Sequence, residues 1–187
     1  MADVIDKPAT KKSNPAPLGL LGFGMTTVLL SLHNADLIPL DAVILSMAVF
    51  CGGLAQFAAG MMEYRNGNTF GTVAFTLYGV FWLVFALIKS DPAGFGSEGL
   101  TMGVFCLVWG ILTLFLFIGT LKGRNALKLV FLTLTVTFFL LAAGDISATV
   151  GLVVAGGFVG LFCGLTAMYT AFAEVLAEQL EKEVLPF

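Results

Sequence analysis

The side chains of this sequence that could hold or move a proton are few, and they lie at the ends of apolar segments. His33 is the only histidine, which excludes a two-histidine metal or haem site within one chain, and we expect it at a wet helix end. Glu63, Asp145 and Glu174 follow or end apolar runs, where water can solvate them. Membrane enzymes need a nucleophile with its base, a carboxylate pair or a metal cluster. We therefore expect no enzymatic activity and no cofactor.

The three cysteines and the basic residues also lack a reactive pattern. Cys51, Cys106 and Cys163 each lie inside an apolar run without a CxxC or Cys/His spacing, so we expect small buried hydrophobic side chains. Basic residues do not form a patch with interleaved aromatics. Nucleic-acid binding is therefore not expected.

Uncharged polar side chains are the remaining candidates for chemistry inside the apolar runs. Most such groups bond back to their own helix or to a neighbouring one. Together they could also line a path of weak hydrogen-bond donors, which suits a small polar solute that must bind and leave. The set comprises Thr26, Thr27, Ser31, Ser46, Gln56, Thr72, Thr76, Tyr78, Thr113, Thr120, Thr133, Thr135, Thr137, Thr166 and Tyr169.

The segment before the first apolar run has the most specific pattern, Asn14-Pro15-Ala16-Pro17-Leu18-Gly19-Leu20. Two prolines two residues apart keep the chain extended, and Pro17 then suits a first helical turn. The backbone amides that follow form a helix N-terminus with a partial positive charge. At membrane depth such an end is a site for an anion. At the surface it is only the start of a helix.

These residues must be positioned by membrane-spanning helices. The chain is 58% hydrophobic and 11% charged, against about 25% charged residues in soluble domains. Apolar runs of about 20 residues match the thickness of a bilayer. The sequence predicts an all-α membrane protein with six transmembrane helices, at 17–35, 40–62, 70–89, 100–121, 126–144 and 149–173.

The segments between these helices complete the predicted organisation. Residues 1–13 are expected to be a disordered N-terminus, 14–173 the transmembrane domain and 174–187 a short charged tail. Residues 1–13 are polar and no cleavage site follows Pro17, so the first helix is not expected to be a signal peptide. The weakest break is Gly144-Asp145-Ile146-Ser147, but 126–173 is too long for a single crossing.

The basic residues predict the orientation. With six helices, eight of the nine lysines and arginines fall on one side and only Lys89 on the other. The positive-inside rule then puts both termini in the cytoplasm. The eight are Lys7, Lys11, Lys12, Arg65, Lys122, Arg124, Lys128 and Lys182.

Glycines mark the expected helix contacts. Gly156, Gly160 and Gly164 recur every fourth residue in the last predicted helix. Small residues let membrane helices approach closely. We expect packing within one subunit, with a contact between subunits as the alternative.

The proline motif and further segments resemble, in order, the acetate uptake transporter family, also called the succinate–acetate permeases. The resemblance covers nearly the whole chain from Asn14 and is greatest to prokaryotic members. Besides the NPAPLGL string of 14–20, it rests on FCGGLAQ (50–56), GNTFG (67–71), AFTLYGVFW (74–82), GTLK (119–122) and EVL (174–176).

The resemblance implies a six-helix subunit in a homohexamer in the cell membrane, with one pathway per subunit for acetate and, more weakly, succinate. By motif matching, an apolar constriction falls on Phe23, Tyr78 and Leu134. Asn14 and Gln56 are implied as polar contacts on the route, with Thr26 and Thr76 behind them. Tyr78 and threonine hydroxyls and helix amides would then face the carboxylate, and apolar side chains its methyl group.

The sequence leaves the energy source and the alternatives open. Entry of an anion against an inside-negative potential costs about 2.3 kcal/mol per 100 mV. A proton carried with acetate removes that charge, yet no histidine or carboxylate is expected at the centre to relay it. Transport of the protonated acid and passive flow of the anion through a channel both remain as alternatives. Other open readings are a pore for urea or an amide, and a sensor or scaffold that uses the charged tail.

Overall fold

Six membrane-spanning helices are present, as the sequence predicts. The computed structural model describes residues 13–96 and 99–186, so residues 1–12 of the predicted disordered segment 1–13 lie outside the described residues. Within these ranges every regular element is a helix, and six are long and apolar enough to cross a bilayer. The bounds are α1 (Ala16–Asn34), α2 (Ala42–Met47), the π-helical η1 (Ala48–Ala55), α3 (Gln56–Arg65), α4 (Thr69–Ser90), α5 (Leu100–Thr120), α6 (Asn125–Ser147) and α7 (Val150–Gln179).

The second span is one continuous helix of three parts. α2, η1 and α3 together form the 24-residue span Ala42–Arg65. The π-helical part lies against α1, where a Cβ on Gly22 would come within 2.6 Å of the Cys51 carbonyl oxygen. Gln56 begins α3 directly after this segment. Single π-helical turns inside α-helices are frequent at functional sites.

The last two spans are separate helices, which confirms the weakest predicted break. Ala148 has a left-handed backbone with φ 51°, and its N–H bonds back to the carbonyl groups of Asp145 and Gly144. α7 then continues to Gln179, so the predicted tail 174–187 begins as helix. The extension contains Glu174, Leu176, Ala177 and Glu178, which are good helix formers.

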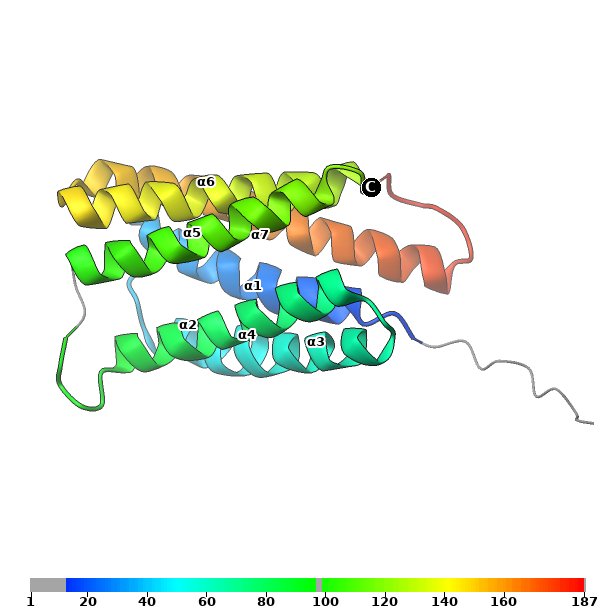
Figure 1. Cartoon of the computed structure of the whole chain (residues 1–187), viewed down its shortest axis with the longest axis horizontal. Helices are drawn as coiled ribbons and strands as arrows, with labels where there is room; N and C mark the ends of the chain where they lie inside the picture. Colours follow the sequence, from blue (N-terminus) through cyan, green and yellow to red (C-terminus); the bar gives the residue numbers. More distant parts are fainter. Residues whose placement is uncertain (1–12, 97–98, 187) are drawn as a thin grey trace, which may run out of the picture.

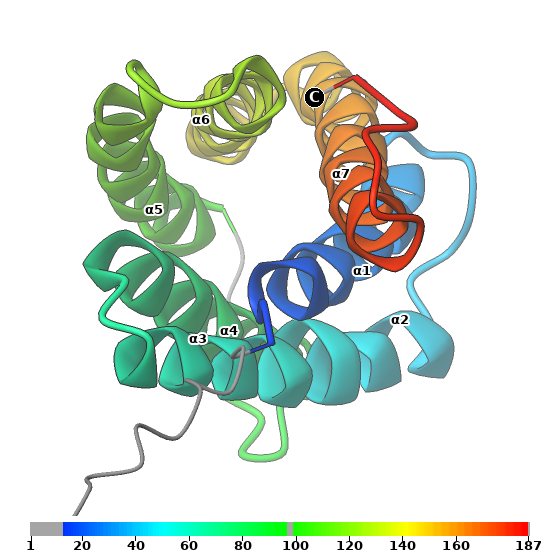
Figure 2. The same ribbon diagram turned by 90° about the vertical axis from the view of Figure 1, so that its right-hand side faces the viewer.

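The helices run along a common direction and surround a central region (Figures 1 and 2). α3 and α4 form a hairpin, α5 packs on α6, and α6 and α1 both pack on α7. The start of α1, the α3–α4 turn, the α5–α6 turn and the end of α7 lie at one end of the bundle, which we call the mouth end. The α1–α2, α4–α5 and α6–α7 connections lie at the far end.

Glycines bring α1 and α7 into backbone contact. A Cβ on Gly164 would lie 2.9 Å from the carbonyl oxygen of Gly24, and a Cβ on Gly24 would lie 2.8 Å from that of Gly164. Gly160 faces Ser31 of α1 in the same way, at 2.5 Å from its Oγ. All three glycines of the repeat therefore serve packing within the chain, as expected: Gly160 and Gly164 face α1, and Gly156 faces α6 at Leu141.

Gly164→Ala is expected to destabilise the bundle. The new Cβ would meet backbone, which cannot rotate away, so α1 and α7 must separate at a cost of about 1–3 kcal/mol. The matched control is Gly151→Ala in the same helix, where a Cβ meets nothing within 4 Å. Thermal unfolding of the detergent-purified proteins measures the difference. Equal melting temperatures for the two variants would contradict this account of the α1–α7 contact.

Candidate functional site

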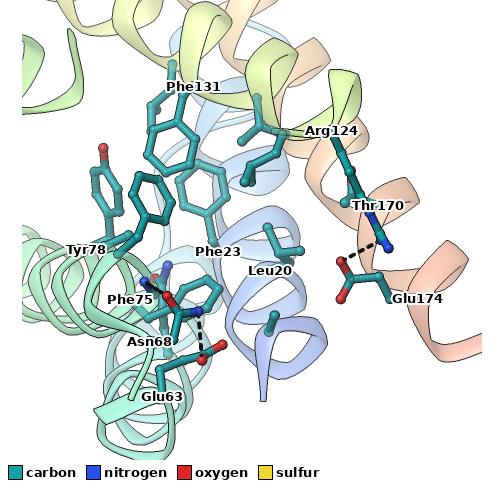
Figure 3. Close-up of a pocket in the computed structure, with 18 residues that line it drawn as sticks. Leu20, Phe23, Glu63, Asn68, Phe75, Tyr78, Arg124, Phe131, Thr170 and Glu174 are labelled. Carbon is teal, nitrogen blue, oxygen red and sulfur yellow. Dashed lines mark hydrogen bonds and ion pairs between the residues drawn. The ribbon is translucent and has the colours of Figure 1, made fainter. Parts of the chain in front are cut away.

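A cavity opens at the mouth end between five helices (Figure 3). Its volume is about 140 Å³, and one water molecule needs roughly 10–15 Å³. The lining is mostly apolar, and its charged residues are Glu63, Arg124 and Glu174. The remaining lining residues are Ala16, Leu20 and Phe23 of α1, Gln56 of α3, Asn68 of the turn, Phe70, Gly71, Ala74, Phe75 and Tyr78 of α4, Leu127, Val130, Phe131 and Leu134 of α6 and Thr170 of α7.

A second, smaller cavity of about 40 Å³ lies further along the bundle and meets the first at three side chains. Phe23, Tyr78 and Leu134 line both cavities, and the two cavities share no other residue. All three side chains are at most 5% exposed, and the Phe23 and Tyr78 ring centroids are 5.9 Å apart. We call this trio the aromatic narrowing. The structure thus brings together the three residues that the resemblance selected from three different helices.

The ring of Tyr78 is held rigidly, and its hydroxyl is already used. The ring packs against Trp109 and Phe131, with centroids 6.0 and 6.3 Å away. Its hydroxyl lies 2.8 Å from Thr113 Oγ1, which itself donates to the Trp109 carbonyl oxygen at 2.7 Å. The Tyr78 hydroxyl is therefore the donor to Thr113, and it points away from Glu63 and the mouth in Figure 3. In this structure the hydroxyl therefore donates its hydrogen bond to Thr113 of α5 and not into the cavity, so its donation to a solute stays a prediction.

Most threonine hydroxyls likewise bond to their own helix, as expected. Thr135 donates to Phe131, and Thr137 to Thr133. Thr26 donates to the Gly22 carbonyl oxygen at 2.9 Å and lines neither cavity. Thr76 also lines neither cavity. The structure therefore does not bring these two predicted contacts to the cavity walls.

Three buried polar groups that line the cavities have no protein partner for one atom. Gln56 is 1% exposed, lines the larger cavity and has an unbonded Oε1. Thr27 Oγ1 and Trp82 Nε1 are unbonded and belong to the lining of the smaller cavity. Buried polar atoms without a partner are rare and indicate a bound water or solute. Such groups therefore lie on both sides of the aromatic narrowing.

The predicted contact residue Asn14 lines neither cavity but binds Glu174, which does. Its Oδ1 accepts from the backbone N–H of Ala16, and its Nδ2 donates to Glu174 Oε2 at 2.9 Å. The other oxygen of Glu174 lies 3.5 Å from Arg124 Nη1. Three segments far apart in sequence therefore meet at the Glu174 carboxylate. Figure 3 shows its contact with Arg124.

Glu63 is a functional candidate that sequence reasoning placed in water. It is 4% exposed, lines the cavity, and accepts from Asn68 Nδ2 at 2.9 Å. Asn68 Oδ1 in turn accepts from the Gly71 N–H at the start of α4. A Cβ on Gly71 would lie 2.9 Å from Glu63 Cδ, so glycine is what leaves room for this carboxylate. The one available signal was that Gln56 and Glu63 are two helical turns apart, on one face.

The arrangement favours the passage of a small solute. Charged side chains line the mouth, while the aromatic narrowing and the smaller cavity are lined without any charge. Among the described residues, no group of three histidine, cysteine or acidic side chains could hold a metal ion. His33, at the far end, contacts the Ile38 carbonyl oxygen through Nδ1 at 3.2 Å.

Comparison with known proteins gives consistent similarities over most of the chain. The model of the GPR1/FUN34/yaaH family matches residues 2–185. The "Succinate-acetate/proton symporter SatP" of Escherichia coli (strain K12) is 50% identical over 184 residues, which are 95% of this chain and 96% of that protein. "Acetate permease A" of Emericella nidulans is 37% identical over 89% of this chain and 63% of its own length. A solved structure, "Structure of the bacterial acetate channel SatP", matches with a TM-score of 0.92 and 49% identity, covering 95% of this chain and 99% of that one.

Proposed function

The chain belongs to the GPR1/FUN34/yaaH family, and from this membership we propose that it carries acetate, and more weakly succinate and other short carboxylates, across the cell membrane with a proton. The resemblance to the succinate–acetate permeases is thereby confirmed. The observation that carries the proposal is the 50% identity to a succinate-acetate/proton symporter over 95% of the chain. The two cavities that meet at the aromatic narrowing support it independently.

The proposed route runs from the mouth cavity through the aromatic narrowing to the smaller cavity. Passage through the aromatic narrowing is the selective step, because a solute between Phe23, Tyr78 and Leu134 can be in contact with apolar groups only. The methyl group of acetate suits these contacts. Gln56 on one side and Trp82 and Thr27 on the other supply polar atoms for its carboxyl group.

The narrowing also favours the neutral form of the solute. A charged carboxylate between apolar rings, without a cation or a hydrogen-bond donor, is strongly disfavoured relative to water. A protonated carboxyl group removes the charge and can donate its O–H to an amide oxygen such as Gln56 Oε1. The proton therefore crosses the narrowing together with the acid.

The mouth end is proposed to face the cytoplasm. Arg65, Lys122, Arg124 and Lys128 lie at the ends of α3 to α6 on this side, while Lys89 lies at the far end of α4. The positive-inside rule then places both termini in the cytoplasm.

A homohexamer with one pathway per subunit is the proposed assembly, as the resemblance implies. The outward face of the second span presents Phe50, Leu54, Phe57 and Met61, each 37% exposed or more, to lipid or a neighbouring subunit. Native mass spectrometry would support this with six copies and would contradict it with any other number.

Uptake of labelled solutes into liposomes tests the function. We expect the purified chain to raise acetate uptake well above that of protein-free liposomes, and unlabelled acetate and propionate to compete. Urea and acetamide are not expected to enter or to compete. Faster entry of urea than of acetate would replace this proposal with that of an amide pore, and the absence of any flux would leave a sensor or scaffold.

A further inference from the structure

We propose that Glu63 is the proton-binding group of the pathway: its carboxylate takes the proton from the acid that has passed the aromatic narrowing and releases it to water at the mouth. This inference rests on the proposed function. It assigns to one side chain a role that the uncharged lining deeper in the pathway cannot fill.

The carboxyl group of Glu63 is buried near the end of a membrane-spanning helix. Glu63 is 4% exposed although it lies only two residues before the end of α3 at Arg65. Carboxylates within transmembrane segments are costly and are a functional hypothesis by default. This one lines the cavity, where it shares the wall with Gln56 from the same helix.

The negative charge of the Glu63 carboxylate is only partly compensated by its neighbours. Within residues 13–96 and 99–186, the one hydrogen bond that the Glu63 carboxyl group accepts comes from the neutral amide of Asn68. Arg124, the cation that lines the same cavity, lies beside Glu174 instead, with Nη1 and Oε1 3.5 Å apart. A buried carboxylate held by one amide is therefore well suited to exist in both the charged and the protonated form.

The charged and titratable groups that line the cavity with Glu63 are few. α4 contributes Tyr78, the start of α6 contributes Arg124, and α7 contributes Glu174. α1 contributes only Ala16, Leu20 and Phe23. Glu174 is the other carboxylate in reach of the cavity, but Arg124 and Asn14 each bind one of its oxygens. Glu63 is therefore the acidic side chain better placed to accept a proton.

The step balances without any further reactant. The O–H bond of the carboxylic acid breaks, an O–H bond on Glu63 forms, and the solute leaves as its anion. Glu63 then gives the proton to water at the mouth and returns to the carboxylate. Export runs through the same steps in reverse, so the direction of transport follows the gradients of the proton and the solute.

The test uses Glu63→Gln, in which the new amide oxygen can still accept from Asn68 and the turn is kept. Labelled acetate uptake and interior pH are recorded together in liposomes with an imposed pH gradient. Acid–base groups contribute at least 100-fold in enzymes, and we expect acetate uptake driven by the gradient to fall roughly tenfold or more. The acetate concentration for half-maximal uptake should change less than about threefold, since a role limited to proton transfer leaves binding intact.

Two further variants make every outcome decisive. Glu63→Asp restores a carboxylate and should recover most of the uptake and the proton entry, while Glu183→Gln, on the exposed tail, should behave like the wild type. If Glu63→Gln takes up acetate and protons as the wild type does, the proposal is overturned. An equal loss of acetate uptake in Glu63→Gln and Glu63→Asp also overturns it, since this would indicate a structural role. If the wild type itself carries no acetate, the proposed function fails instead.

Discussion

Tyr78→Ala is expected to raise the uptake of butyrate relative to acetate by roughly tenfold. The ring forms one wall of the aromatic narrowing, 5.9 Å from the Phe23 ring, and packs on Trp109 and Phe131. Its removal gives room for a longer chain. Butyrate has two more methylene groups than acetate, and each is worth about 0.8 kcal/mol when buried, which sets the upper limit of the change. Competition among acetate, propionate and butyrate for labelled uptake measures the ratio.

Two control variants distinguish the effect of the Tyr78 ring on selectivity from that of its hydroxyl and from nonspecific effects of replacing a tyrosine. Tyr78→Phe should keep the wild-type selectivity, because Thr113 retains its bond to the Trp109 carbonyl oxygen. Tyr64→Ala removes a tyrosine that is 69% exposed and should leave selectivity unchanged. Loss of a buried aromatic ring costs about 3–5 kcal/mol, so melting temperatures are recorded for each variant. Unchanged relative uptake in a folded Tyr78→Ala protein would count against this position for the narrowing.

Gln56→Leu is expected to lower acetate uptake by about 10- to 100-fold. Leucine keeps the approximate volume of the glutamine side chain, so the packing of this 1% exposed position is preserved. What disappears is the amide whose oxygen has no protein partner and which lines the larger cavity. Hydrogen bonds to charged or strongly polar solutes contribute about 1.5–3 kcal/mol, which corresponds to this loss. Initial rates of labelled acetate uptake measure it.

The pattern across substrates distinguishes Gln56 from Tyr78. The amide is expected to contact the carboxyl group that all short acids share, so acetate and butyrate uptake should fall together in Gln56→Leu. Gln179→Leu, at the exposed end of α7, is the matched control and should transport normally. A Gln56→Leu protein that takes up acetate within threefold of the wild-type rate would remove this residue from the pathway.

The fold could be predicted nearly completely because the bilayer imposes it. Each helix must satisfy its own backbone groups, so length and hydropathy predict the six spans to within about three residues at every end but one. The exception is α7, which continues to Gln179 beyond the predicted end at residue 173. The break at Ala148 was the weakest predicted, and the structure contains it as a left-handed residue. The contact partners of Gly160 and Gly164 needed the structure, since a repeat of small residues does not say which helix it faces.

The site could be predicted only where the family resemblance selected its residues. The resemblance selected Phe23, Tyr78 and Leu134, and the structure brings them together. The burial of Glu63 was missed because α3 continues to Arg65 and Asn68 folds back onto the carboxyl group. The Asn14–Glu174 bond joins residues 160 positions apart, which no local pattern reveals. The hydrogen bond between the Tyr78 hydroxyl and Thr113 could not be predicted either, because Thr113 lies on another helix. The hydroxyl was therefore expected to be available to a solute.

In the proposed mechanism acetate crosses the aromatic narrowing without net charge, together with one proton. The most direct measurement is labelled acetate entry into liposomes at pH 6 and pH 8, with the membrane potential held at zero or at about −100 mV inside, after subtraction of protein-free liposomes. We expect acetate entry to be much faster at pH 6 than at pH 8 and independent of the membrane potential. Acetate entry that slows strongly at the negative potential and does not depend on pH would contradict this mechanism. It would indicate transport of the anion, whose entry against that potential costs about 2.3 kcal/mol.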